Sequence, residues 1–296
     1  MKEFLNKASI ILLTMIIFIY TSVPAVLADA IVGDVIVTLG EDLSQDQKQQ
    51  VLKDMGVDEN EVEIIYVSNE EEHNYLGDYI PASQIGSNAI SSAKITLRDD
   101  DTGVVVTTNN INYITGSMYS NALATAGVSG AEVYVTAPFT VSGTGALTGI
   151  IKAYEETTGE AIDEGVKQAA NEEMVVTAEL AEEIDEEQAV DFINEIKERM
   201  AEENPQSESE VRDLIQRLAD ELGINLSSDL LDQLVSLFNN LRNLNIDWDK
   251  VSRTIDAARD KIADFAESEE GKNIIQSVVN FFKSVWDWFL SVFSKD

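Results

Sequence analysis

The chemistry open to this chain is best sought in a run of small residues, Ser142, Gly143, Thr144 and Gly145, which joins a predicted strand to a predicted helix. Backbone N–H groups at the start of a helix point outward with the positive end of the helix dipole behind them, so such a turn can bind an anion. The run has no P-loop lysine, and its glycines do not follow the G-x-G-x-x-G spacing of dinucleotide-binding loops. A structural turn is therefore the simpler interpretation, and an anion or ligand loop is the functional alternative.

The side chains of the common catalytic and metal sites are missing or isolated. The sequence has no cysteine, which excludes disulfides, thiol nucleophiles and thiolate-bound metals. His73 is the single histidine, so a histidine-based metal site cannot form within one chain, and no serine lies in a nucleophile motif. The run Asp99-Asp100-Asp101 lacks the ligand spacing of an EF-hand and favours a turn. We predict no catalytic, cofactor-binding or metal-ligating residue.

The charge of the chain narrows the choice of partner. The formal net charge is -34 over 296 residues, and binding to nucleic acid depends on lysine and arginine side chains that neutralise phosphates. We therefore expect no nucleic-acid partner, and simple electrostatic docking on anionic lipid is disfavoured for the same reason. Such acidity is compatible with cation binding at a surface or wall, although a solvated face is the simpler interpretation.

The N-terminus has the pattern of a secretory signal peptide. Lys2 and Lys7 flank a short basic region, residues 8–20 are almost wholly apolar, and small residues precede a cut after Ala28. The apolar run is too short to favour a membrane span. We expect cleavage after Ala28, with Ala30 as the second choice and an uncleaved anchor as the alternative. The mature protein would be secreted or held at the cell surface.

Two segments that follow have the pattern strand, helix, strand. Capping residues open both helices, and a Gly-Val pair closes each of them. The first unit is predicted as a strand at 35–39, a helix from Ser44 to about Met55 and a strand at 62–67; the second as a strand at 104–108, a helix from Thr115 to Gly127 and a strand at 132–135.

A constant spacing relates the two segments. The first strands of the two units match at an offset of 69 residues. The helix starts, the Gly-Val pairs and the second strands match at an offset of 71, and the change predicts a small difference in loop length. We interpret this as an internal duplication of a β-α-β unit about a pseudo-symmetric sheet, with chance similarity as the alternative. The pairs at 71 are Leu43-Ser44 with Ile114-Thr115, Gly56-Val57 with Gly127-Val128, and Glu61-Val62 with Glu132-Val133.

A hairpin is expected between the units. Residues 92–97 are predicted to pair with residues 104–109, because Arg98 to Gly103 contains the aspartates and glycine that tight turns require.

Beyond Gly149 the apolar residues recur with helical spacing. We predict an α/β (α+β) N-terminal domain with duplicated β-α-β units, followed by an all-α C-terminal region, with a linker around Pro205. The expected division is a signal peptide at 1–28, the α/β domain at 29–150, an acidic helical extension packed on it at 151–204, and a helical subdomain at 205–296.

The last predicted helix, about residues 272–293, has an unusually wide apolar face that includes Phe282, Trp286 and Phe289. Three interpretations stay open: a core helix, an oligomer contact, or an interfacial helix at a membrane surface. A cell-wall, membrane-surface or protein partner would bind through these side chains, and the oligomeric state is not predicted.

Several motifs along the chain resemble the YpuA-like family of predicted secreted bacterial proteins of unknown function. The resemblance covers nearly all of the expected mature chain and implies a secreted or surface-held protein. It carries no catalytic residues. The motifs are Val37-Thr38-Leu39-Gly40, Ile85-Gly86, Ala89-Ile90-Ser91-Ser92, Tyr119 to Val128, Pro138 to Gly149, and Glu172 to Thr177.

Two classes of function follow from the sequence. The first is a non-enzymatic secreted or envelope-associated protein that binds a partner, cations or wall polymer without a cofactor. The alternative is a carboxylate-based extracellular hydrolase acting on glycan, which would need two acidic side chains about 5 to 10 Å apart in a cleft. The abundance of acidic residues permits this hydrolase, but no spacing in the sequence indicates it.

The cleavage site gives the first testable prediction. Protein purified from the culture medium should begin at Asp29, as determined by N-terminal sequencing and intact mass. The variant Ala28→Tyr places a large side chain directly before the cut and should leave the precursor uncleaved or shift the cut to follow Ala30. A chain that begins at Met1 and stays with the cell membrane would instead establish an uncleaved anchor.

Overall fold

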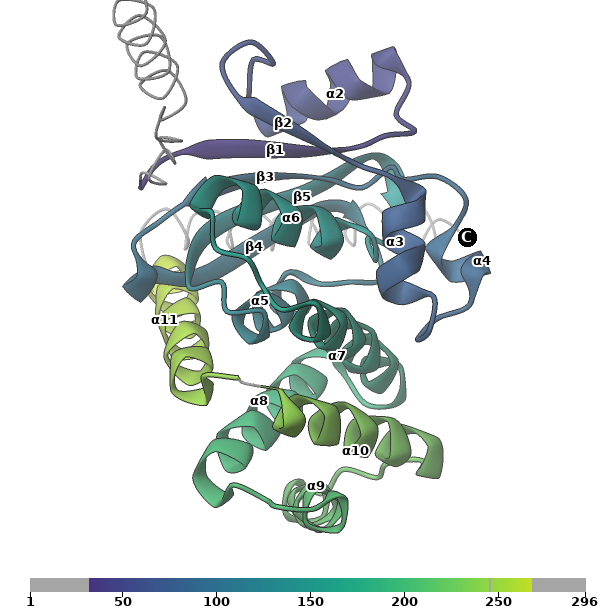
Figure 1. Cartoon of the computed structure of the whole chain (residues 1–296), viewed down its shortest axis with the longest axis vertical. Coiled ribbons are helices and arrows are strands. Elements are labelled where there is room, and N and C mark those ends of the chain that lie inside the picture. The colour runs from purple at the N-terminus through teal and green to yellow at the C-terminus, as the bar shows by residue number, and fades with distance from the viewer. Residues whose placement is uncertain (1–31, 245, 268–296) are drawn as a thin grey trace, which may run out of the picture.

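The computed structural model describes residues 32–244 and 246–267. Its N-terminal half contains a mixed sheet in the order β2-β1-β3-β5-β4, drawn in the upper part of Figure 1. Strand β3 is antiparallel to both of its neighbours, while β1 with β2 and β4 with β5 form parallel pairs. The strands are β1 (Val35–Gly40), β2 (Glu63–Val67), β3 (Ser92–Leu97), β4 (Gly103–Ile111) and β5 (Gly130–Val141).

Helices cover parts of both faces of the sheet and continue below it (Figure 1). An α/β half followed by a run of helices confirms the fold class expected from the sequence. The helices are α2 (Gln45–Met55), α3 (Asn69–Leu76), α4 (Ala82–Ile85), α5 (Gly116–Thr125), α6 (Ala146–Thr158), α7 (Glu164–Glu183), α8 (Glu186–Glu203), α9 (Glu208–Leu222), α10 (Ser228–Asn243) and α11 (Trp248–Glu267), with a 3-10 turn, η1, at Asp100–Thr102.

Local features of the two β-α-β segments coincide at the offset of 71. Ser44 caps α2 and Thr115 caps α5, each through its side-chain oxygen. Both helices end in the same pair of backbone hydrogen bonds. The N–H groups of Gly56 and Val57 donate to the carbonyls of Lys53 and Leu52, and those of Gly127 and Val128 to the carbonyls of Ala124 and Leu123. In both helices the capping glycine has a positive φ, which a side chain would strain.

Strand pairing extends this offset to the first strands of the two segments. Ile36 pairs with Glu63 and Thr107 with Tyr134, so partners lie 27 residues apart in both. The equivalent positions in β1 and β4 therefore also differ by 71, and the offset of 69 expected from the sequence is wrong. The offset of 69 came from matching the apolar residues of the two strands. The backbone hydrogen bonds set which residues pair across the strands, and this register gives 71 instead.

The two helices nevertheless lie on opposite faces of the sheet. Helix α2 packs with Val37 and Leu39, whereas α5 and α6 pack in the core that contains Ile36. Successive side chains of a strand point to opposite faces, so neighbouring residues of β1 contact different helices. The two segments therefore share their helix caps and strand register at one offset, but their helices pack on different faces of the sheet. The duplication stays a prediction.

The predicted hairpin between residues 92–97 and 104–109 is wrong. Strand β3 pairs with β1 on one side and β5 on the other, which uses both of its edges. Strand β4 pairs with β5, because the parallel partner supplied by the β-α-β segment takes precedence over the nearest strand in sequence. The aspartates instead form η1, and the Ser129 hydroxyl donates to Asp100 at 2.7 Å.

Helix α3 was not expected from the sequence, although its signal was present. Ser68 and Glu71 form a capping box in which each side chain bonds the other residue's backbone. The helix begins directly after β2, and its Leu76 is fully buried. The helical spacing expected beyond Gly149 is confirmed by the run of helices from α6 to α11.

Helix α7 contributes to two hydrophobic cores. Ala170, Met174 and Val175 pack in the core beneath the sheet, while Val176 and Leu180 pack in a second core with α8, α9 and α10. Residues on both sides of position 204 therefore share the second core, and α11 returns to contact β4 and α5. The domain boundaries stay predictions.

Two sequence-based expectations lie outside the described residues: the signal peptide at 1–28 and the apolar helix at about 272–293 with Phe282, Trp286 and Phe289. Within residues 32–244 and 246–267, no helix is long and apolar enough to cross a membrane.

A buried ion pair fixes α7 against its neighbours. Lys197 Nζ of α8 lies 2.5 Å from Glu173 Oε1 of α7, and both side chains are at most 1% exposed. The Thr125 hydroxyl of α5 donates to Glu173 Oε2 at 2.7 Å, and Lys197 also donates to the Asn121 carbonyl. Burial lowers the pKa of Lys197 and raises the pKa of Glu173, and their mutual attraction opposes both shifts.

Removing one partner of this pair should be costly. The variant Lys197→Met leaves the Glu173 carboxylate buried without its cation, and we expect a loss of about 3–5 kcal/mol in the free energy of unfolding. The double variant Lys197→Met, Glu173→Leu should recover most of this loss, because an apolar pair of similar volume carries no buried charge. Urea unfolding measures both.

The matched control is Arg199→Met, which removes a partly exposed ion pair with Glu195 on the same helix and should cost less than about 1 kcal/mol. A loss for Lys197→Met no larger than that of this control would contradict the structural role given to the buried pair.

Candidate functional site

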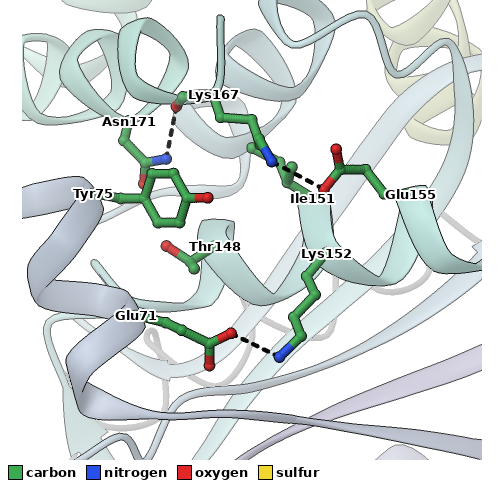
Figure 2. A pocket seen from close by; sticks show the side chains of 8 residues that line it. All are labelled: Glu71, Tyr75, Thr148, Ile151, Lys152, Glu155, Lys167 and Asn171. Carbon is green, nitrogen blue, oxygen red and sulfur yellow. Dashed lines mark hydrogen bonds and ion pairs between the residues drawn. The ribbon is translucent and has the colours of Figure 1, made fainter. Parts of the chain in front are cut away.

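A cavity of about 150 Å³ lies between α3, α6 and α7, and we call it the α3–α6–α7 pocket (Figure 2). At about 30 Å³ for each water in the liquid, it has room for about five waters. It mixes charged, aromatic and aliphatic side chains from three helices that are distant in sequence. The lining residues are Glu71, Tyr75, Thr148, Ile151, Lys152, Glu155, Lys167 and Asn171.

Helical spacing brings these side chains to the pocket. On an α-helix, residues three or four apart share a face. Glu71 and Tyr75 lie four apart on α3, and Lys167 and Asn171 lie four apart on α7. Helix α6 presents a longer stripe of the same kind, made by Thr148, Ile151, Lys152 and Glu155.

The charged side chains of the pocket pair with one another. Lys152 Nζ lies 2.7 Å from Glu71 Oε1 and donates to the Tyr66 carbonyl at 2.9 Å. Lys167 Nζ lies 3.2 Å from Glu155 Oε2 and 3.1 Å from Glu164 Oε2. The pairs cross between α3 and α6 and between α7 and α6, so they hold the three helices around the cavity.

The pKa shifts follow from these contacts. Burial raises the pKa of Glu71, but hydrogen bonds from Lys152 and Ser68 outweigh it, and the net pKa lies below the ordinary value. Burial lowers the pKa of Lys167, but hydrogen bonds to Glu164 and Glu155 outweigh it and leave the pKa raised. Both groups are therefore charged at neutral pH.

Two polar atoms at the pocket are buried without a hydrogen-bond partner among the described residues: Thr148 Oγ1 and Asn171 Oδ1. We call them the open polar atoms. Thr148 is 5% exposed and Asn171 1% exposed, and the amide nitrogen of Asn171 donates to the Lys167 carbonyl. Figure 2 shows the Tyr75 side chain reaching from α3 to the space between them. A buried polar atom without a partner costs about 1–3 kcal/mol, so a bound molecule that bonds to it gains affinity.

Two other cavities fit a ligand less well. A wider hollow of about 550 Å³ lies over β3, β5 and β4, but within the described chain its lining contains no buried polar atom that lacks a partner. A cavity of about 60 Å³ under α11 also has two buried polar atoms without a partner among the described residues, Asn121 Nδ2 and Asn194 Oδ1, but it has room for only about two waters.

The predicted anion loop lies immediately before α6, next to the pocket but outside its lining. Ser142 and Thr144 lie within hydrogen-bond distance of each other at 3.3 Å, and the buried Tyr119 hydroxyl donates to the Gly143 carbonyl. A Cβ atom at Gly145 would lie 2.0 Å from Glu72 Oε1, so the carboxylate of Glu72 packs against the start of α6. The protein places a carboxyl group of its own where the sequence predicted a bound anion, and ligand binding by this loop stays a prediction.

The environment of Glu72 raises its pKa to about 7. Burial is the largest cause, and the charges of Asp42 and Glu71 add to it, while the Asn69 side chain lowers it by donating to Glu72 Oε2 at 3.3 Å. The N-terminal end of α6 favours the charged form and opposes the burial.

Other candidate residues have local structural contacts. His73 Nε2 lies 2.9 Å from the Gly86 carbonyl. In the part of the chain that the structure describes, no group of three or more metal-ligating side chains is placed to hold a metal ion. Sequence reasoning missed the α3–α6–α7 pocket; the capping box at Ser68 and the four-residue spacing on α3 were the available signals.

Comparison with known proteins places the chain among uncharacterised relatives. Residues 39–258 match a family described as "Protein of unknown function (DUF1002)". The "Uncharacterized protein YpuA" of Bacillus subtilis (strain 168) is 52% identical over 268 residues, which cover 90% of this chain and 92% of that protein. No solved structure matches.

The raised pKa of Glu72 gives a pH-dependent prediction. A carboxyl group whose pKa rises on folding holds its proton better in the folded state, so its contribution to stability is greatest below about pH 4.5 and is lost as the pH rises to about 7. Glu72→Gln cannot lose a proton. Relative to wild type, it should therefore gain stability between about pH 5 and about pH 8, on the order of 2 kcal/mol.

Urea unfolding at the two pH values measures this gain. Glu70→Gln, an exposed position on the same helix, is the matched control and should show no such pH-dependent gain. A gain for Glu72→Gln that stays constant with pH would mean that the N-terminus of α6 fully offsets the burial.

Proposed function

The chain belongs to the DUF1002 family of proteins of unknown function, and from this premise we propose that it is an exported, non-enzymatic protein that binds a small polar ligand in the α3–α6–α7 pocket. The observation that carries the proposal is the pair of open polar atoms, Thr148 Oγ1 and Asn171 Oδ1, at a single cavity. Native proteins pair nearly all buried polar groups, and this cavity is larger than the one under α11 that also has two such atoms, so it is the better candidate for a bound ligand.

The hydrogen bonds of the pocket glutamates favour a binding protein over a hydrolase. Glu71 accepts a hydrogen bond from Lys152, which helps to hold its pKa below the ordinary value, and Glu155 accepts one from Lys167. A glycan hydrolase needs one carboxylic acid that keeps its proton near neutral pH. The glutamates whose pKa burial raises to about 7, Glu72 and Glu172, lie outside the pocket lining.

The proposal that the protein is exported rests on its sequence alone. The basic and apolar N-terminus with small residues before Ala28 supports secretion, and the absence of cysteine is compatible with it. A ligand encountered outside the cell membrane or at the wall is then the natural occupant of the pocket. Retention at the surface through Phe282, Trp286 and Phe289 is a separate part of the proposal.

A thermal-shift panel tests the binding function. The protein is heated with representatives of several classes: amino acids, monosaccharides, dicarboxylates, diamines and nucleosides. At least one class should raise the melting temperature of the wild type, because a ligand at about 100 times its Kd adds about 2.7 kcal/mol of stability. The same compounds should not stabilise Asn171→Leu, which removes one open polar atom and fills its space.

Asn243→Leu serves as the matched control, because the Asn243 amide bonds the carbonyl four residues earlier, as Asn171 does, but lies exposed on α10. The binding proposal fails if no class shifts the wild type, or if Asn171→Leu responds as the control does. Conversion of the stabilising compound during incubation, followed by NMR, would show an enzyme instead.

A further inference from the structure

We propose that the ligand of the α3–α6–α7 pocket is a neutral, polyhydroxylated molecule of the size of one sugar ring. This inference rests on the binding function proposed above and adds the chemical class of the ligand. Three properties of the lining lead to it: its balanced charge, the hydrogen bonds that it leaves unmade, and its apolar surfaces and size.

The charge of the lining is balanced. Two ammonium groups and two carboxylates face the cavity, and each lysine already bonds a glutamate: Lys152 with Glu71, and Lys167 with Glu155. Each lysine also bonds a second oxygen, from the Tyr66 carbonyl or from Glu164. A charged ligand would have to compete with an ion pair for its partner, whereas a neutral ligand leaves both pairs intact.

The open polar atoms require a ligand that both donates and accepts hydrogen bonds. Asn171 Oδ1 is a carbonyl oxygen and can only accept, so the ligand must donate to it. Thr148 Oγ1 belongs to a hydroxyl, which can donate as well as accept. Hydroxyl groups have both capacities without carrying charge, and two of them on one molecule would satisfy both atoms.

The remaining lining suits a compact ring with apolar faces. The Tyr75 ring and the buried Ile151 side chain provide apolar surface beside the polar atoms. A sugar ring has hydroxyls at its edge and C–H groups on its faces, so it can contact both kinds of surface. A cavity of about 150 Å³, with room for about five waters, admits at most one such ring and no oligosaccharide.

Sugars that share a ring but differ in charge provide the test. Calorimetric titration of the mature chain compares glucose with glucosamine and glucuronate, and galactose with galactosamine and galacturonate. We expect at least one neutral sugar to bind, and its cationic and anionic counterparts to bind about tenfold more weakly or worse.

Variants on one helix connect the binding to the pocket. Thr148→Val keeps the shape of the side chain and removes an open polar atom, so it should weaken sugar binding about tenfold without lowering the stability of the free protein. Thr158→Val on the same helix is the control; its hydroxyl donates to the Tyr154 carbonyl at 2.8 Å, and the residue lies outside the lining. Sugar binding should be unchanged in this control.

The outcomes separate the two proposals. If a charged sugar, an amino acid or a diamine binds tightest and Thr148→Val weakens it, the pocket binds a ligand but the neutral-sugar assignment is overturned. If no tested compound binds, or if Thr148→Val does not change the affinity, both the binding function and the neutral-sugar assignment are overturned.

Discussion

The buried ion pair between Glu173 and Lys197 fixes the position of α7, and much of the remaining structure depends on that helix. Glu173 accepts hydrogen bonds from Lys197 of α8 and Thr125 of α5, so one carboxylate connects three helices. Removing two charges from water costs several kcal/mol for each ion, and only close contact with further hydrogen bonds offsets this cost. A shift of α7 along its axis would break these contacts, which makes a single register strongly preferred.

That register also shapes the α3–α6–α7 pocket. Asn171 lies two residues before Glu173, and Lys167 lies one turn earlier, so the ion pair that anchors α7 sets where both side chains meet the cavity. The same helix contributes to the core under the sheet and to the core of the helical region. The pocket therefore lies where the two parts of the chain are held together.

Two neighbouring acidic residues of helix α3 make different contacts. Glu71 caps the helix and pairs with Lys152 at the pocket, while its neighbour Glu72 is buried against Gly145 at the start of α6. Consecutive residues on a helix point in directions about 100° apart, so one turn of α3 serves both the pocket and the loop before α6. The carboxyl group of Glu72 lies where the small-residue turn would otherwise bind an external anion, so the neighbouring cavity offers a ligand more room than the loop does.

The sequence by itself determined the local features of this protein. The capping box at Ser44, the glycine at position 56 and the helical periodicity beyond Gly149 predicted their elements, because caps and periodicity act within a few residues. Only the tertiary structure decided which strand lies beside β3, which face α2 covers, and that α3, α6 and α7 enclose one cavity. Strand pairing and cavity formation depend on contacts between segments far apart in the chain, whose energies no local pattern of residues records.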